Sequence, residues 1–482
     1  MSADGARRRP PRIPGYPFLF SLFPVLHLYM RNISEISPGQ AIWAAAAALG
    51  IAFIFWPFTR LLTARPEKRA ALLFLFLLLF HFYGLYYGQI AGLLPCGLSL
   101  PASHALAGLF PAAAWALLAF FLVRSRSSFL AAHRFLGIAV WILLGWNIAG
   151  ILFHAGSSLA NSPRRNRPER PQFRTTPGSA PDIYCFILDE FAAPESAQRL
   201  FGLDAAPFSE ALRRRNFAVA PNSRARFALT EPAIADILNL GQSAENADAA
   251  SVVRRSAVVG LLKRRGYRII DFACLKHLFL DAADQRIYYD LSRAAIFFDD
   301  FYRTLFERSL LRVLPDAWRR RETDLVPFYR QRVLQVFEEL PAIVEAQGLK
   351  FVFVHLFSPH EPFVFAADGN SAHPSLIWDH SDPRRYLGQY RYISRRILET
   401  VDMIMEKSRR PPVILLQSDH GYRGSRRRGN RIPRAEMVSV LNALYLPEAP
   451  PGTVDPSLSP RNNFRLVFNL YFGADYPLLP ND

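Results

Sequence analysis

The sequence is poor in cysteine, with only Cys96, Cys185 and Cys274 among 482 residues. So few cysteines, in an odd number, do not provide the disulfide framework that stabilises small secreted domains. Cys185 and Cys274 lie in strand-like segments and could meet on neighbouring strands, but buried free thiols are the simpler interpretation. There is no internal repeat, so we do not expect a repeat architecture.

Acidic residues are also fewer than basic ones. The chain has 40 Asp and Glu against 57 Lys and Arg, which gives a formal net charge of +17. A charge of this size can indicate nucleic-acid binding. Here, however, the arginines gather beside apolar segments and in one linker and do not alternate with stacking aromatic residues. We therefore attribute the basic charge to a membrane and expect no nucleic-acid partner.

The hydrophobic residues, 51% of the chain, are concentrated in its first third. Four apolar stretches approach the ~20 residues that cross a bilayer as a helix: residues 42–62, 71–94, 105–123 and 135–153. A shorter run, residues 16–30, contains two prolines and a histidine. It could be a fifth span, an interfacial helix or a signal-type segment, and we expect it to be retained because no small-residue cleavage site follows it.

Positive charge alternates between the loops that connect these segments. Arginine and lysine are frequent before residue 16, between residues 60 and 69, and between residues 124 and 134, whereas the intervening loops have few. The positive-inside rule therefore predicts five crossings with a cytoplasmic amino terminus. The segments lack the buried charges that mark an ion pathway, which disfavours a transporter.

This pattern divides the chain into three parts. Residues 1–160 are predicted to form a multi-span anchor of about five helices, and residues 161–180 a linker rich in proline and arginine. Residues 181–482 then form a large domain outside the cytoplasm. An outward-facing protein with several spans suggests a bacterial inner membrane as its location.

After residue 181, near-continuous apolar strands alternate with helical patterns. The expected strands are residues 182–188, 267–273, 350–356, 412–418 and 437–446. The expected helices are residues 209–215, 231–240, 329–347 and 385–407, with a last one after residue 460. This alternation predicts an α/β/α sandwich in which helices cover both faces of a mostly parallel sheet. In such sheets, function gathers at the carboxyl ends of the strands.

Polar residues lie at those strand ends. Asp189 ends the first strand, Asp419 and His420 follow residues 412–418, and His360 comes shortly after residues 350–356. Two carboxylates and an imidazole, combined with a hydroxyl group, could hold one divalent cation, which could be Mn, Zn, Mg or Ca. For each residue alone, a turn or a helix cap is the simpler interpretation. His355 lies inside its strand, so we interpret it as a core histidine.

Thr230 supplies the hydroxyl group, since it lies between a loop and an apolar-periodic helix. It could simply be an N-cap residue. The amino terminus of a helix also stabilises an alkoxide and an incoming phosphate, and a metal ion would lower the pKa of the hydroxyl group. The two interpretations are compatible.

Five segments occur in an order that resembles the sulfatase-like branch of the alkaline phosphatase superfamily: PDIYCFILDE, the loop ending at Thr230, HLFSPHEPF, LLQSDHG and NALYLPE. SDHG combined with an aspartate at the end of the first strand is a specific pairing. The resemblance covers about residues 181–447 and is to multi-span, extracytoplasmic threonine enzymes such as lipoteichoic acid synthases and phosphoethanolamine transferases. The five-span anchor is similar to the same group.

The resemblance implies roles for individual residues. Asp189, Thr230, Asp419 and His420 would form one metal site, with Thr230 attacking phosphorus to give a phosphothreonine. His360 would bind substrate oxygen or protonate the leaving group. Arg423, shortly after SDHG, could hold a phosphate or headgroup, or belong to a solvated loop. Glu190, where many relatives carry a small residue, could contact the metal or point away.

Two departures from the family restrict the reaction. A sulfatase requires Cys/Ser-x-Pro-x-Arg, whereas this chain has Thr230-Glu231-Pro232-Ala233-Ile234, so we do not expect sulfate ester hydrolysis. No second aspartate and histidine set follows His420, so we expect one metal ion. The disulfide-rich pattern of many phosphoethanolamine transferases is absent, which leaves the donor headgroup open.

We therefore predict a membrane-anchored phosphotransferase or phosphodiesterase. It would take a headgroup from a membrane phospholipid and pass it to an envelope glycan or lipid, with donor and enzyme in the same membrane plane. The alternatives are a sulfatase-like hydrolase that releases product to water and a catalytically silent membrane scaffold. The sequence indicates no particular oligomeric state.

Overall fold

The computed structural model describes residues 14–33, 36, 38–90, 100–160, 180–243, 248–272, 274–288, 300–313, 322–373, 377, 382–424 and 432–481. The chain divides into two compact units. The helical unit comprises residues 1–160 and 291–320, and the α/β unit comprises residues 161–290 and 321–482. The predicted linker, residues 161–180, lies outside the described residues except for Ala180.

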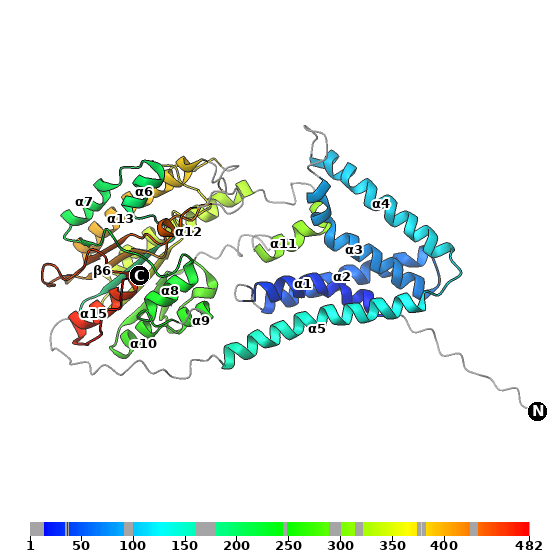
Figure 1. Ribbon diagram of the computed structural model, residues 1–482, viewed down its shortest axis with the longest axis horizontal. Helices are drawn as coiled ribbons and strands as arrows, with labels where there is room; N and C mark the ends of the chain where they lie inside the picture. Colours follow the sequence, from blue (N-terminus) through cyan, green and yellow to red (C-terminus); the bar gives the residue numbers. More distant parts are fainter. Residues whose placement is uncertain are drawn as a thin grey trace, which may run out of the picture. The chain divides into compact units, whose positions relative to one another are not determined.

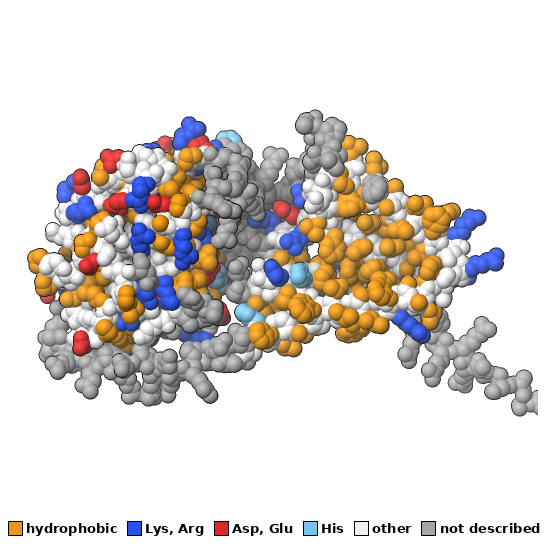
Figure 2. Space-filling model, in the orientation of Figure 1, with side chains coloured by type: hydrophobic (Ala, Val, Ile, Leu, Met, Phe, Trp, Pro, Cys, Tyr) orange, Lys and Arg blue, Asp and Glu red, His pale blue; other side chains and the backbone are white. Residues whose placement is uncertain are grey.

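The described part of residues 1–160 contains five α-helices: α1 (Tyr16–Arg31), α2 (Pro38–Phe58), α3 (Pro66–Ile90), α4 (Leu100–Arg124) and α5 (Leu130–Ala160) (Figure 1). Four segments are long and apolar enough to cross a membrane: Pro38–Leu61, Pro66–Ile90, Ala102–Arg124 and Leu130–His154. Large apolar side chains such as Trp43 and Trp146 are exposed on this unit, and Figure 2 shows its surface covered by hydrophobic side chains. Such a surface suits lipid, not water.

Helix α1 is shorter than these four segments, but it lies parallel to α5. Tyr16 is bonded to His133 (Oη to Nδ1, 3.2 Å), and further along His27 is bonded to Asn147 (Nδ1 to Oδ1, 3.2 Å). The side chain of Met30 then packs against Gly150. Helix α1 has 16 residues, which is roughly 24 Å of helix and shorter than the ~30 Å of a bilayer core. The crossing of the membrane by α1, and with it the count of five spans, stays a prediction.

A segment from the middle of the chain also belongs to the helical unit. Helix α11 (Asp300–Arg308) and the 3₁₀ turn η6 (Leu310–Val313) pack against α1 and α3. Phe301 is buried in a cluster with residues of α1 and α2, and the Tyr302 hydroxyl donates to the carbonyl of Gln40 (3.3 Å). The Arg312 guanidinium lies over the ring of Tyr87 (4.9 Å). Sequence analysis did not foresee this return to the helical unit.

The α/β unit is built on a seven-stranded sheet with the order β2-β7-β6-β1-β5-β3-β4. Its strands are β1 (Ile183–Leu188), β2 (Ala218–Val219), β3 (Arg268–Phe272), β4 (Gln285–Arg286), β5 (Lys350–Leu356), β6 (Val413–Ser418) and β7 (Asn442–Tyr445). The five strands from β6 to β4 are parallel, and β7 and β2 add antiparallel pairs at one edge. The predicted strand at residues 437–446 is shorter than expected, because its start is the end of the short helix α14 (Arg434–Met437).

Helices cover both faces of this sheet. On one face lie α6 (Pro194–Phe201), α7 (Ala206–Arg214), α12 (Glu322–Glu345) and α13 (Pro383–Lys407). On the other face lie α8 (Thr230–Leu238), α9 (Ala249–Arg254), α10 (Ala257–Arg264) and α15 (Asn463–Phe472). Two hydrophobic cores therefore form, and they divide successive residues of each central strand between them. The predicted α/β/α sandwich is confirmed.

Candidate active site

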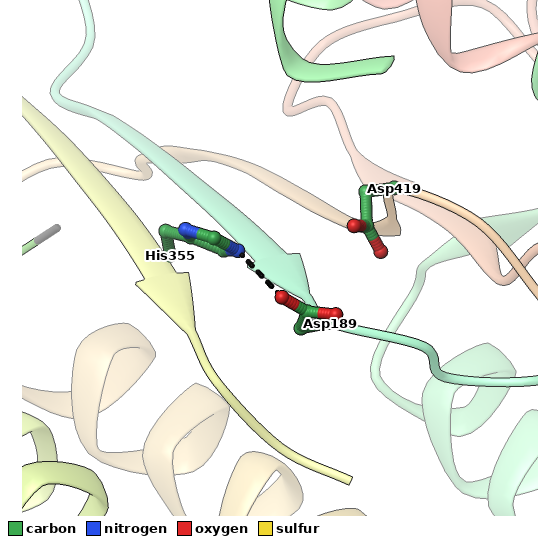
Figure 3. Close-up of side chains that lie close together, drawn as sticks. All are labelled: Asp189, His355 and Asp419. Atoms are coloured by element: carbon green, nitrogen blue, oxygen red, sulfur yellow. Dashed lines mark hydrogen bonds and ion pairs between the residues drawn. The ribbon is translucent and has the colours of Figure 1, made fainter. Parts of the chain in front are cut away.

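Two central strands end in acidic residues that lie side by side. Asp189 follows β1 and Asp419 follows β6, and the residues before them are paired in the parallel register. His355 of β5 is paired with Ile187. Because alternate residues of a strand share a face, Asp189, His355 and Asp419 point to the same side of the sheet, which is the side covered by α8. Figure 3 shows the three side chains together.

These three residues form a compact buried group whose candidate ligand atoms all lie within 4.8 Å of one another. His355 Nε2 lies 3.2 Å from Asp189 Oδ2. Within the described part of the chain, Asp189 Oδ1 and Asp419 Oδ2 are buried and have no hydrogen-bond partner. Two orphaned carboxylate oxygens in a dry site are costly unless a cation neutralises them.

His420 and Thr230 complete the arrangement around these oxygens. His420 Nε2 lies 3.4 Å from Asp419 Oδ2, 3.9 Å from Asp189 Oδ1 and 3.3 Å from Thr230 Oγ1. His420 Nδ1 lies 2.8 Å from the Gly421 carbonyl oxygen. Since a carbonyl can only accept, Nδ1 carries the proton and Nε2 presents its lone pair to the carboxylates, as a metal-ligating histidine requires.

The ligand set predicted from the sequence is therefore brought together. The oxygens of Asp189, Asp419 and Thr230 all lie within 3.9 Å of His420 Nε2, and two carboxylates, a hydroxyl group and an imidazole are a donor set that fits one divalent cation. His355 is close enough to be a ligand, but both its ring nitrogens already have partners, Asp189 and Cys274. We therefore place His355 behind Asp189, where it orients that carboxylate.

Thr230 is the first residue of α8, and its side chain is buried. Leu229 occupies the cap position, so Thr230 is not the N-cap that the simpler interpretation expected. Its hydroxyl group is hydrogen-bonded to His420 across the site. It lies at the amino terminus of α8, where the helix dipole favours negative charge.

His360 and Arg423 lie together at the rim. Arg423 Nη2 is 3.2 Å from His360 Nε2, and His360 Nδ1 is 2.7 Å from the Glu361 carbonyl oxygen. Glu190 joins them, because its carboxylate accepts from the Arg423 backbone amide (2.7 Å) and lies 3.8 Å from His360 Nε2. Glu190 has a left-handed backbone (φ 59°), and its own amide donates to Asp419 Oδ1 (3.1 Å). It therefore connects the rim to the carboxylate pair.

No protein-family model and no curated protein matches the sequence. Among solved structures, the chain is similar to the C-terminal periplasmic domain of EptC from Escherichia coli in complex with zinc, with 14% identity, 64% of this chain and 86% of that chain covered, and a TM-score of 0.43. It is similar to the integral membrane protein lipooligosaccharide phosphoethanolamine transferase A (EptA) from Neisseria meningitidis, with 11% identity, 95% of each chain covered, and a TM-score of 0.43.

A third similar structure is a protein of the alkaline phosphatase superfamily from Vibrio parahaemolyticus, with 14% identity, 61% of this chain and 67% of that chain covered, and a TM-score of 0.40. Phosphoethanolamine transferases and a member of the alkaline phosphatase superfamily are thus among the structures to which the chain is similar.

Burial and the neighbouring charges shift the pKa values of the acidic and histidine side chains of the site. Burial alone would raise the pKa of Asp189, but His360, His355 and His420 outweigh it and hold this pKa below its usual range. Burial raises the pKa of Asp419, and the neighbouring charge of Asp189 raises it further. Burial opposes the charged form of His360, yet Asp189 and Glu190 raise its pKa. In this structure the His360 proton is on Nδ1, which donates to the Glu361 carbonyl, and Nε2 accepts from Arg423.

Sequence reasoning missed the contact of His355 with the site. Its strand is apolar on both faces, so periodicity could not tell which residues face the site. The available signal was spacing, since His355 lies an even number of residues after Phe351 and Phe353, which are buried on the same face as Ile187.

Proposed function

We propose that this chain is a membrane-anchored, metal-dependent phosphotransferase or phosphodiesterase that works through a phosphothreonine at Thr230. The donor is the headgroup of a membrane phospholipid, and the acceptor is an envelope glycan or lipid. The observation that carries the proposal is the placement of the Thr230 hydroxyl. It lies at a helix amino terminus, 3.3 Å from His420 Nε2, beside two buried carboxylates that each have an unpaired oxygen.

Asp189, Thr230, Asp419 and His420 would hold the divalent cation. When bound, the cation lowers the pKa of the hydroxyl group and stabilises negative charge on the phosphoryl oxygens. Thr230 Oγ1 forms the new bond to phosphorus as the bond to the lipid oxygen breaks. Thr230 is the first residue of α8, and the dipole at this helix end favours the negative charge of the phosphoryl group.

The rim residues have separate tasks in this reaction. In the free site His360 Nε2 accepts from the Arg423 guanidinium (3.2 Å), and it can take up a proton once Arg423 turns to a phosphoryl oxygen. Burial opposes this protonation, but Asp189 and Glu190 raise the pKa of His360, and Nε2 then delivers the proton to the departing lipid oxygen. Arg423 binds a phosphoryl oxygen, and Glu190 fixes its backbone through the 2.7 Å hydrogen bond. The acceptor hydroxyl then attacks the phosphothreonine in a second step.

The helical unit supports an orientation in the membrane. Its loop arginines, such as Arg60 and Arg126, lie in the α2–α3 and α4–α5 connections, which are held at one end of the bundle by the hydrogen bond from Lys68 Nζ to the Val123 carbonyl (2.8 Å). By the positive-inside rule this end is cytoplasmic. The chain leaves α5 at the opposite end. The α/β unit is then outside the cytoplasm, which suits a bacterial inner membrane.

The test is the intact mass of the purified full-length chain in detergent after incubation with mixed phospholipids and Mn or Zn. We expect a phosphoryl-headgroup adduct on the wild type and none on Thr230→Ala. Thr400→Ala is the control, because Thr400 is also buried but bonds only within α13. The mass of the adduct identifies the donor headgroup.

Adding an acceptor then separates the two possible reactions. Loss of the adduct only in the presence of a glycan or lipid acceptor means transfer, and loss in water alone means hydrolysis. If the wild type has no adduct and retains no metal, the covalent mechanism is wrong and the silent scaffold becomes the better explanation.

A further inference from the structure

Behind the carboxylate pair, a buried thiol extends the hydrogen-bond network of the site. Cys274 Sγ lies 3.2 Å from His355 Nδ1, and His355 Nε2 lies 3.2 Å from Asp189 Oδ2. Cys274 is 6% exposed, His355 1% and Asp189 0%. A continuous chain of three side chains therefore runs from the end of β3 through β5 to the end of β1, away from water.

The partners of a neutral His355 permit one arrangement of protons. The Asp189 carboxylate can only accept, so His355 Nε2 must carry the proton and donate it. In that neutral ring Nδ1 accepts from the Cys274 thiol. Burial opposes the charged ring, but Cys274 and Asp189 raise the pKa of His355, and in the charged ring Nδ1 donates to the Cys274 sulfur, so Cys274 is the partner of Nδ1 in either state. Removing this donor leaves a buried ring nitrogen unsatisfied and lets the other tautomer, or a rotated ring, compete.

The orientation of Asp189 depends on this imidazole. Because His355 holds Oδ2, the other oxygen of Asp189 is presented to His420 and to the remaining donor atoms. Mutation of a residue that orients a ligating carboxylate in this way commonly lowers metal affinity by about 10 to 100 times.

We propose that Cys274 is a positioning residue of the metal centre, and that its thiol acts through His355 to fix the Asp189 carboxylate. This inference rests on the proposed function, because it requires that Asp189 binds a metal ion. Cys274 itself contacts neither metal nor substrate. Its hydrogen bond sets the tautomer and the ring orientation of His355.

The chain provides a matched control in Cys185. This thiol is also buried and free, but it lies within β1, and its contact is the Gln417 side-chain amide (3.6 Å). Cys185→Ala therefore removes the same atoms from a core position without touching His355. Cys274→Ser retains a hydroxyl donor of similar direction, whereas Cys274→Ala removes the donor.

The experiment measures the zinc affinity of the full-length protein in detergent by competition with a chelating dye. It also records the thermal midpoint of each metal-free variant, which separates general destabilisation from an effect on the site. We expect Cys274→Ala to raise the zinc Kd about 10 to 100 times. The Kd values of Cys274→Ser and Cys185→Ala should stay within about threefold of the wild-type value, less than the lower limit of that effect.

Three outcomes would overturn the inference. If Cys274→Ala binds zinc as tightly as the wild type, the positioning role is wrong while the proposed function stands. If Cys274→Ser loses as much affinity as Cys274→Ala, hydrogen-bond donation is not the cause. If the wild type binds no zinc, manganese, magnesium or calcium, the metal centre fails and this inference fails with it.

Discussion

At the residue scale, the dominant feature is the pair Asp189 and Asp419. Both side chains are fully buried, and each has an oxygen without a hydrogen-bond partner in the described part of the protein. Like charges at this separation raise the free energy of the metal-free fold, since little water is present to screen them. The same pair of carboxylates therefore lowers the stability of the metal-free protein and raises its affinity for a cation.

Asp419→Asn should change stability with opposite sign in the absence and presence of metal. In a chelator, we expect the amide to relieve the repulsion and donate toward Asp189, which raises the free energy of unfolding by about 1 to 3 kcal/mol. With saturating zinc, the variant should be less stable than the wild type because a charged ligand is lost. Thermal midpoints under both conditions test this, and a shift of the same sign in both would contradict it.

Asp271 gives a prediction for pH. It is fully buried at the end of β3, its Oδ2 accepts from the Leu280 amide (2.8 Å), and burial raises its pKa to about 6. An unfolded aspartate has a pKa of about 3.9, so between about pH 4 and 6 the folded state binds the extra proton. The contribution of Asp271 to stability is therefore present below about pH 4 and is lost as pH rises through 6.

Asp271→Asn should remove this pH dependence. The advantage of the variant over the wild type should grow between pH 4 and 6 to at most about 3 kcal/mol, which is roughly two units of pKa, and then stay constant. The measurement is the difference in thermal midpoint between the two proteins across pH 4 to 8. A difference that does not vary with pH would show that Asp271 ionises normally.

At the element scale, much of the α/β unit could be predicted from the sequence. The strands β1, β5 and β6 and the helix that begins at Thr230 follow local hydrophobic patterns, so their ends could be located. Asp189 and Asp419 were found because strand ends converge in a parallel sheet. The contact of His355 with Asp189 was not predicted. It depends on the register of β5 against β1, and the periodicity of side chains along one strand gives no information about that register.

The packing partner of helix α11 could not be predicted from the sequence either. It is a nine-residue amphipathic helix, and its apolar face would suit any apolar partner. In the structure it packs on α1 and α3, where the absence of a side chain at Gly84 makes room for it. A β-carbon built on Gly84 would collide with the carbonyl oxygen of Glu307.

Gly84→Ala should therefore displace α11, at a cost of about 1 to 3 kcal/mol for overpacking. Gly88→Ala, one turn further along α3, meets no atom within 4 Å and should be neutral or stabilising. We expect a lower thermal midpoint for the first variant only, together with faster tryptic cleavage near Arg303 and Arg308. Equal behaviour of the two variants would contradict the packing of α11 on α3.

At the scale of the whole molecule, the exposed apolar surface of the helical unit and its four candidate spans indicate a membrane protein. The orientation depends on whether α1 crosses as a fifth span. Five crossings place Gly15 on the same side as the α4–α5 loop, whereas four crossings place it with the α/β unit.

Single cysteines introduced into a Cys96→Ser background test this topology. We expect Asp368→Cys, on the surface of the α/β unit, to react with a membrane-impermeant maleimide in intact cells. Gly15→Cys and Ser127→Cys should react only after the membrane is permeabilised. If Gly15→Cys is labelled in intact cells together with Asp368→Cys, α1 does not cross and the five-span prediction is wrong.

The membrane helices, the α/β alternation and the acidic strand ends could be predicted from the amino-acid sequence, because they follow from hydrophobic runs and periodicities within short stretches of chain. Which side chains meet depends on how the strands and helices pack in the folded protein. Asp189 and His355 are 166 residues apart, and His355 and Cys274 are 81 apart, yet each pair is in contact. Such contacts depend on the register of a whole sheet, and the packing of α11 depends on the fit between two helix surfaces. Neither property can be read from a local sequence pattern.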